Sequence, residues 1–136
     1  PTTLNAGDYF IVDRTNYVTG SNGNHANMYI ETSEPIYMYQ TLLGGGGTTG
    51  GLVLIPPFNC YQPRQITIPL ANEVGGDTYD AELLVFTEAG STLTINGVVQ
   101  TLKETVPGTG YESYKIPGVT GNLDVKSTGA MSVSLF

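Results

Sequence analysis

The chain has 136 residues, a formal net charge of −7 and only 12% charged residues. Its five Lys and Arg residues are scattered, so they cannot form the basic surface that binds nucleic-acid phosphates or an anionic membrane. No apolar run approaches the roughly 20 residues of a membrane-spanning helix. Because 40% of the residues are hydrophobic, the chain has enough apolar surface to fold and lacks the composition of a disordered segment. We therefore expect a single domain spanning residues 1–136.

The elements predicted in the first half of the chain are strands rather than helices. No ten-residue window free of Gly and Pro has apolar residues at helical spacing. Apolar and alternating runs instead predict strands at residues 9–12, 27–32, 36–42 and 52–55. Alternation within residues 36–42 predicts two sides of one strand: Ile36, Met38, Gln40 and Leu42 on one, and Tyr37, Tyr39 and Thr41 on the other.

The second half continues with short strands separated by turn residues. The expected strands are residues 66–68, 81–87, 93–95, 98–102, 111–116, 123–126 and 131–135. Asn96-Gly97 predicts a two-residue type I′ turn that joins two of them as a hairpin. A second hairpin is expected around the loop 127–130. About ten short strands with Gly, Pro, Asn and Asp between them predict an all-β fold, an antiparallel β-sandwich with a single domain.

The residues needed for catalysis or zinc binding are scarce. Cys60 is the single cysteine, so no internal disulfide can form, and we expect it to be a small buried hydrophobic residue. The one histidine, His25, lies in a Gly/Asn-rich loop with no nucleophile motif nearby. The glycine-rich run at residues 44–51 is followed by an apolar segment and lacks a lysine, so we interpret it as a flexible connector rather than a phosphate-binding loop. We therefore expect no catalytic residues and no enzymatic activity.

Four acidic residues cluster around Gly75-Gly76. They are Glu73, Asp77, Asp80 and Glu82. Acidic loops supply the oxygen ligands that Ca²⁺ prefers, which makes calcium the one cofactor to consider here. Because the spacing does not match a known calcium loop, the alternative is an acidic loop exposed to solvent.

Nine tyrosines, four phenylalanines and no tryptophan favour a binding function. Tyr29, Tyr37 and Tyr39 lie in expected strands and are predicted to pack in the core, whereas Tyr17, Tyr61, Tyr79 and Tyr111 flank turns and are predicted to be exposed. Two proline clusters stiffen residues 56–64, which present a set of polar and aromatic side chains. The candidate ligand-binding residues are Asn59, Tyr61, Gln62 and Arg64, together with Tyr79. The same segment is also consistent with a structured crossover between two sheets.

Three segments resemble the N-terminal IgGFc-binding-like β domain found in large surface proteins of gliding and other Bacteroidetes. They are SEPIYMYQ at residues 33–40, GLVLIPPFNC at residues 51–60 and YKIPGVTGNLDVKSTG at residues 114–129. The resemblance covers most of the chain from Gly7 onward. It implies an extracellular, non-catalytic binding or adhesion module, and it provides neither catalytic residues nor a binding site that can be assigned residue by residue.

The leading functional hypothesis is a binding or adhesion module of a bacterial surface or secreted protein, with a protein or glycan ligand. One alternative is a carbohydrate-binding module of a secreted glycan-degrading system, although the lack of Trp counts against it. Another is a structural subunit that assembles by strand addition through residues 9–12 or 131–136. The chain begins at Pro1 without a signal segment, so we expect a piece processed or excised from a longer secreted or surface protein.

Overall fold

The computed structural model describes residues 2–20, 22–23, 25–42, 51–59 and 61–136. Expectations for Cys60 and for the glycine run at 44–50 therefore lie outside the described residues. The described residues form fourteen short strands and a single three-residue 3₁₀ helix, η1 (Arg14–Asn16). This confirms the all-β fold class predicted from the sequence.

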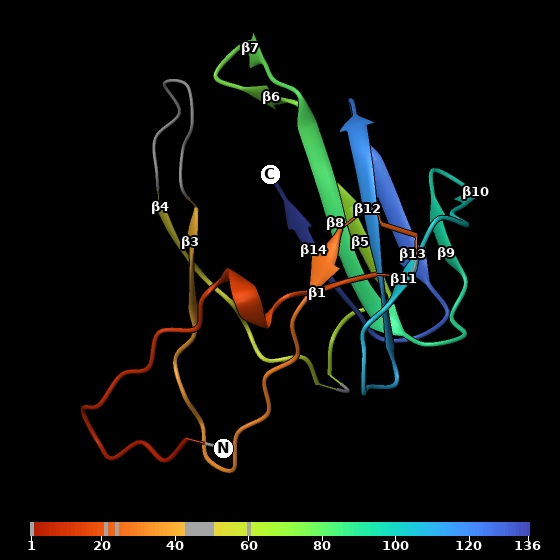
Figure 1. Cartoon of the computed structure of the whole chain (residues 1–136). Coiled ribbons are helices and arrows are strands. Elements are labelled where there is room, and N and C mark those ends of the chain that lie inside the picture. Colours follow the sequence, from red (N-terminus) through yellow and green to blue (C-terminus); the bar gives the residue numbers. More distant parts are fainter. Residues whose placement is uncertain (1, 21, 24, 43–50, 60) are drawn as a thin grey trace.

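Eight strands form two four-stranded antiparallel sheets that pack face to face (Figure 1). The first sheet has the order β10-β9-β13-β5, with bounds Val98–Val99, Leu93–Ile95, Leu123–Ser127 and Gln65–Ile68. The second sheet has the order β11-β12-β8-β14, with bounds Glu104–Thr105, Tyr111–Val119, Ala81–Glu88 and Met131–Leu135. The molecule is therefore a β-sandwich in this half of the chain, as expected.

Side-chain alternation along the central strand β8 determines which face of the second sheet is buried. Ala81, Leu83, Val85 and Thr87 are buried, and the residues between them are only partly so. Register places Tyr114 of β12 and Val133 of β14 beside Val85, so the apolar side chains of three strands meet on one face. The first sheet contributes Leu93, Ile95, Leu123 and Val125 to the same core. Every described apolar residue that is fully buried comes from Ala71 onward.

The two hairpins expected from the sequence have different outcomes. Asn96 and Gly97 both have positive φ angles, 50° and 79°, and Ile95 pairs with Val98, which confirms the type I′ hairpin. The hairpin expected around residues 127–130 is wrong, because β13 pairs with β5 and β9 whereas β14 pairs with β8. These residues cross from one sheet to the other. A buried hydrogen bond of 2.8 Å between the hydroxyls of Thr87 and Ser127 joins the two sheets at the crossing.

The first half of the chain forms separate two-stranded ribbons. These are β1 (Val18–Thr19) with β2 (Ala26–Asn27), and β3 (Tyr39–Leu42) with β4 (Gly51–Leu54); a third ribbon, β6 (Glu73–Val74) with β7 (Asp77–Thr78), follows β5. Among the described residues up to position 70, only Asn27 is buried. Residues 9–12 form no strand, and the strands expected at 27–32 and 36–42 are shorter than predicted. Apolar alternation gives these segments strand propensity, but a strand also needs a neighbouring backbone to pair with.

Candidate binding surface

The β3–β4 ribbon is an uncharged antiparallel pair. Residues 35–63 contain no Asp, Glu, Lys, Arg or His. Tyr39 lies opposite Leu54 and Thr41 opposite Leu52, and the Ile55 N–H donates to the Met38 carbonyl at 2.9 Å, which extends the ladder by one pair. Edge strands of natural proteins are usually protected by charged side chains or by cover. This ribbon has no such charge.

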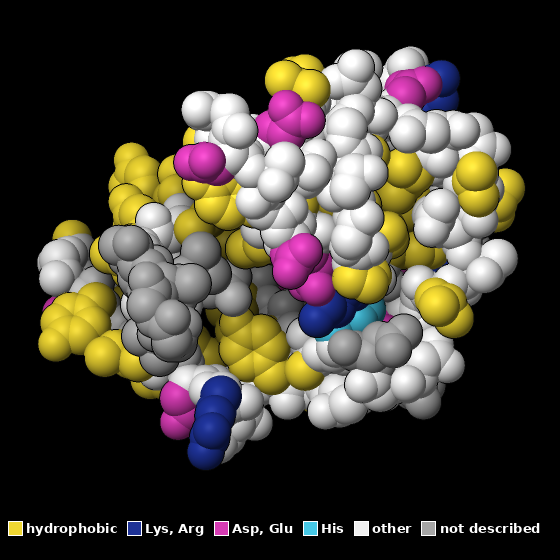
Figure 2. Space-filling model, turned by 90° about the horizontal axis from the view of Figure 1, so that it is seen from above, with side chains coloured by type: hydrophobic (Ala, Val, Ile, Leu, Met, Phe, Trp, Pro, Cys, Tyr) yellow, Lys and Arg dark blue, Asp and Glu magenta, His cyan; other side chains and the backbone are white. Residues whose placement is uncertain are grey.

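One face of the ribbon exposes four large apolar side chains, which we call the ribbon face. Its members are Tyr37, Tyr39, Leu52 and Leu54, with exposed fractions of 85%, 57%, 68% and 52%. Figure 2 shows hydrophobic side chains gathered on the side of the molecule that carries this ribbon. The predicted division of residues 36–42 into two sides agrees with this arrangement. The prediction that Tyr29, Tyr37 and Tyr39 pack in the core is wrong, because all three are exposed.

The opposite face of the ribbon lines a groove of about 440 Å³. Met38 and Ile55, which are hydrogen-bonded to each other, form part of its wall together with Ile36 and Pro57. Ile30 and Glu34 from the preceding segment also line the groove, and Glu34 is the one charged residue in the lining. The ribbon therefore has two apolar faces, one open and one that borders a groove.

Both edges of the ribbon carry backbone groups available for pairing. β3 and β4 form a two-stranded sheet with no third strand among the described residues. Because the Ile55–Met38 pair is hydrogen-bonded, alternation along an antiparallel ladder turns the N–H and C=O groups of Tyr39 and Leu54 outward. Tyr39 and Leu54, which expose apolar side chains, thus also turn backbone donors and acceptors toward edges that no described strand covers.

The candidate residues at 59–64 are largely engaged in their own turn. The Asn59 side-chain oxygen accepts a hydrogen bond from the Tyr61 N–H at 2.9 Å, and the Gln62 side-chain amide donates to the Pro57 carbonyl at 3.1 Å. The Arg64 carbonyl accepts from the Ser127 N–H at 2.9 Å, which ties the segment to the sandwich. Tyr61, Asn59 and Arg64 are exposed, and 93% of the surface of Tyr61 is open to solvent.

Tyr79 does not join those four candidates. It is exposed, and its N–H donates to the Asn72 carbonyl at 2.8 Å beside the β6–β7 ribbon. Strand β5 separates the two groups, because residues 59–64 come before it and the β6–β7 ribbon comes after it. The two groups therefore lie at opposite ends of the sandwich (Figure 1). The five predicted ligand-binding residues therefore do not form one site.

The four acidic residues named as calcium ligands are also spread out. Glu73 and Asp77 lie in the β6–β7 ribbon, opposite Thr78 and Val74 respectively. Glu82 lies in β8 and forms an ion pair with Lys115 at 3.2 Å. In the part of the chain that the structure describes, no group of three or more His, Cys, Asp or Glu residues is arranged to hold a metal ion. The structure gives the calcium hypothesis no support.

Comparison with known proteins gives one match. A family model described as IgGFc binding protein matches residues 1–136. The chain belongs to the IgGFc-binding protein family. This is a family of binding domains and not a known enzyme family, in agreement with the exposed ribbon face. Neither a curated protein sequence nor a solved structure matches the chain. Within the described ranges, this family member has no helix with the length and hydropathy needed to span a membrane.

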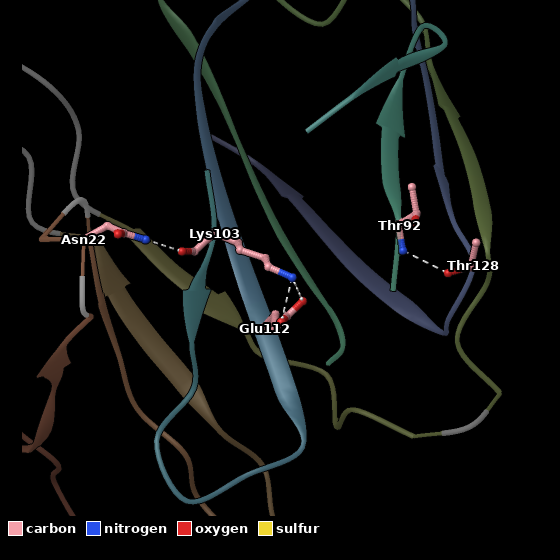
Figure 3. A network of polar contacts seen from close by, with 5 residues as sticks. All are labelled: Asn22, Thr92, Lys103, Glu112 and Thr128. Atoms are coloured by element: carbon pink, nitrogen blue, oxygen red, sulfur yellow. Dashed lines mark hydrogen bonds and ion pairs between the residues drawn. The ribbon is translucent and has the colours of Figure 1, made fainter. Parts of the chain in front are cut away.

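Sequence reasoning missed a polar junction that joins the first quarter of this IgGFc-binding domain to the second sheet. His25 Nε2 lies 2.7 Å from the Ser113 Oγ, and the Asn27 side-chain amide donates to the same oxygen at 2.8 Å. The Asn22 N–H donates to the Glu104 carboxylate at 3.0 Å, and its side-chain amide donates to the Lys103 carbonyl at 2.6 Å. Figure 3 shows Asn22 reaching Lys103, whose ammonium group in turn pairs with Glu112 at 2.8 Å.

The distance between His25 and Ser113 is that of a catalytic nucleophile and its base, but the pair lacks the access to solvent that catalysis needs. Ser113 is completely buried, so no substrate can reach its oxygen. Burial is the main cause that lowers the pKa of His25, partly offset by the Glu104 charge. The buried Nδ1 atom has no hydrogen-bond partner among the described residues to orient the ring. The pair therefore has a structural role: it attaches the segment around His25 to strand β12. No local sequence motif could have revealed it, because His25 and Ser113 are far apart in the sequence.

Proposed function

We propose that this domain is a non-catalytic, extracellular binding or adhesion module of a bacterial surface or secreted protein, and that the ribbon face holds its protein ligand. The main evidence is that four large apolar side chains are exposed together on an uncharged ribbon. Single exposed apolar residues are common on soluble proteins, whereas contiguous apolar patches usually mark interaction sites. Membership of the IgGFc-binding family supports a binding role.

The separation of the apolar core from the exposed ribbon also supports this proposal. The apolar core lies entirely in the sandwich, so the ribbon can expose its side chains without loss of core packing. Tyrosine is well suited to such a surface, because it offers a large contact area with little conformational freedom to lose. A bacterial location is supported by the resemblance of residues 33–40 and 51–60 to Bacteroidetes surface proteins.

The family description names the first ligand to test, the Fc fragment of IgG. Binding of the chain to immobilised Fc is measured by surface plasmon resonance for the wild type and for the double variant Tyr37→Ser, Leu52→Ser. We expect at least a tenfold loss of affinity. Leu102→Ser is the matched control, because Leu102 and Leu52 are each 68% exposed but Leu102 lies outside the ribbon. Equal affinity of the double variant and the wild type would remove the ribbon face from the binding function.

Tyr61 supports carbohydrate binding as a second candidate function. Its ring is the most exposed large hydrophobic side chain described and stands on a turn held by Asn59. An exposed ring can stack on a sugar face. Binding on a glycan array that disappears in Tyr61→Ala but persists in Tyr37→Ser would favour this function, and a blank array would reject it.

The outer edge of β14 beyond Met131, whose N–H donates to the Pro63 carbonyl at 3.0 Å, supports assembly as a third candidate. β14 is the outermost strand of its sheet, and Leu135 and Phe136 are partly exposed at its end. An edge strand can accept a strand from another chain. Sedimentation velocity would then show concentration-dependent species that disappear when Leu135 and Phe136 are deleted. A monomer at every concentration would reject assembly.

A further inference from the structure

The groove beside the ribbon combines apolar walls with a single acidic group. Ile30, Ile36, Met38, Ile55 and Pro57 supply the walls, and Glu34 stands among them in a space of about 440 Å³. This volume lies within the range of sites that take small ligands or a few side chains. Pro35 is also apolar, and Thr32 and Ser33 add hydroxyl groups, so the lining has six apolar residues of nine. An apolar side chain that enters the groove would leave water for contact with a mainly apolar surface.

No cationic side chain pairs with the Glu34 carboxylate among the described residues. The ion pairs in the described part of the chain are Lys103–Glu112, Lys115–Glu82 and Lys126–Asp124. Residues 15–63 contain no Lys or Arg at all. A second copy of the ribbon would bring a second Glu34 and no basic residue. The charge of the groove therefore favours a basic partner over self-association at this place.

We propose that the groove takes an apolar side chain of an extended polypeptide ligand, and that a lysine or arginine next to that side chain pairs with Glu34. This inference rests on the proposed protein-binding function and adds the chemistry of the ligand. An extended segment fits because the ribbon beside the groove offers unpaired backbone groups at Tyr39 and Leu54. The groove selects for the apolar side chain, and Glu34 selects for the neighbouring charge.

The test uses the full chain and two fluorescein-labelled seven-residue peptides. Both have the same alternating valine and threonine core, and one has lysine at each end where the other has glutamate. Fluorescence anisotropy at low salt measures binding to the wild type, to Glu34→Gln and to the control Glu31→Gln. Glu31 is exposed, three residues away and outside the groove lining, so the control removes the same charge nearby.

We expect the lysine peptide to bind the wild type at least tenfold more tightly than the glutamate peptide. Glu34→Gln should weaken the lysine peptide about fivefold, the size of a good exposed ion pair, and Glu31→Gln should leave it within about twofold. Ile36→Ser should weaken both peptides. High salt should reduce the preference for lysine.

Three results would overturn the proposal. They are equal binding of both peptides to the wild type, equal losses in Glu34→Gln and Glu31→Gln, and no binding of either peptide. Each result can be separated from failure of the proposed function. If Fc binding is lost in the ribbon-face double variant but unaffected by Glu34→Gln and Ile36→Ser, the ribbon binds protein and the groove does not.

Discussion

His25 Nε2 lies 2.7 Å from Ser113 Oγ, and this contact joins the first quarter of the chain to the beginning of β12. Asn27 donates to the same hydroxyl, and Asn22 bonds to Glu104 and to the Lys103 backbone nearby. Among the described residues, none before Ile66 belongs to the apolar core or packs against it. The contacts that attach the first quarter of the chain to the sandwich are therefore mainly polar, so they depend on the protonation state of His25 and on hydrogen-bond geometry.

Mild acid should weaken this attachment. Burial lowers the pKa of His25 in the folded protein below its ordinary value of 6.5, with Lys115 acting in the same direction and Glu104 and Glu82 against it. The unfolded chain therefore binds more protons in this range. The stability that neutral His25 contributes is complete above pH 6.5 and declines as the pH falls through 6.5 toward the folded-state pKa.

Urea unfolding at pH 7.5 and pH 5.5 measures this effect. We expect the wild type to be less stable at pH 5.5, and His25→Gln to show a smaller difference between the two pH values. The lowered pKa values of Asp8, Asp13 and Asp124 act at lower pH, below about 3.8, so they do not interfere. The same pH dependence in His25→Gln would show that another group is responsible.

Gly20→Ala should destabilise the protein by about 1–3 kcal/mol, the usual cost of overpacking a tight contact. A Cβ at Gly20 would overlap the side-chain carboxylate of Glu104, which is itself buried. Gly110→Ala is the control, because a Cβ there meets nothing within 4 Å and its φ angle is not positive. Urea midpoints measure both variants. Similar midpoints for the two would mean that the Glu104 contact with residue 20 adjusts freely.

Leu83→Ala should cost about 2–5 kcal/mol of unfolding free energy, because it leaves a cavity in the core. Leu83 is fully buried on β8 between the two sheets. Leu102→Ala, at a site that is 68% exposed, should change stability by less than about 0.5 kcal/mol. Denaturant unfolding compares the two substitutions. Comparable losses would contradict the assignment of the core to this sandwich.

A fragment of residues 63–136 should fold by itself. It contains both four-stranded sheets and every fully buried apolar residue described. Removal of residues 1–62 opens Glu104 and Ser113 to water, which can hydrate both groups. We expect a cooperative urea transition followed by circular dichroism. A fragment without a cooperative transition would show that the N-terminal half is needed for folding.

Excess EDTA should leave the thermal unfolding midpoint unchanged. Glu73, Asp77, Asp80 and Glu82 are not gathered into a group that could hold a metal, and Glu82 pairs with Lys115. Differential scanning calorimetry with and without EDTA measures the midpoint. A fall in the midpoint that added Ca²⁺ reverses would establish a calcium site.

Local sequence signals predicted a large part of the second half of the chain. The Asn96-Gly97 pair requires positive φ angles at two successive residues, and the structure has them. The strand expected at residues 81–87 is β8, and alternation correctly placed Tyr39 and Thr41 on the side of the ribbon opposite to Met38, because side-chain direction in an extended chain reverses at each residue. The spacing of short apolar runs and turn residues likewise predicted the all-β fold class.

Only the tertiary structure decided which strands pair and which apolar faces are covered. The turn residues at 127–130 could equally have joined two strands of one sheet or two sheets. The second is correct, because β13 pairs with β5 and β9 whereas β14 pairs with β8. Tyr37 and Tyr39 have the pattern of core residues but face solvent, because no second layer covers the ribbon among the described residues. The net charge of −7 comes entirely from residues outside 35–63, because this segment has no charged residue. The apolar ribbon within the segment is exposed to solvent. Strand pairing and the burial of an apolar face depend on segments that are distant in the sequence. Turn type and side-chain direction depend on residues that are adjacent in the sequence.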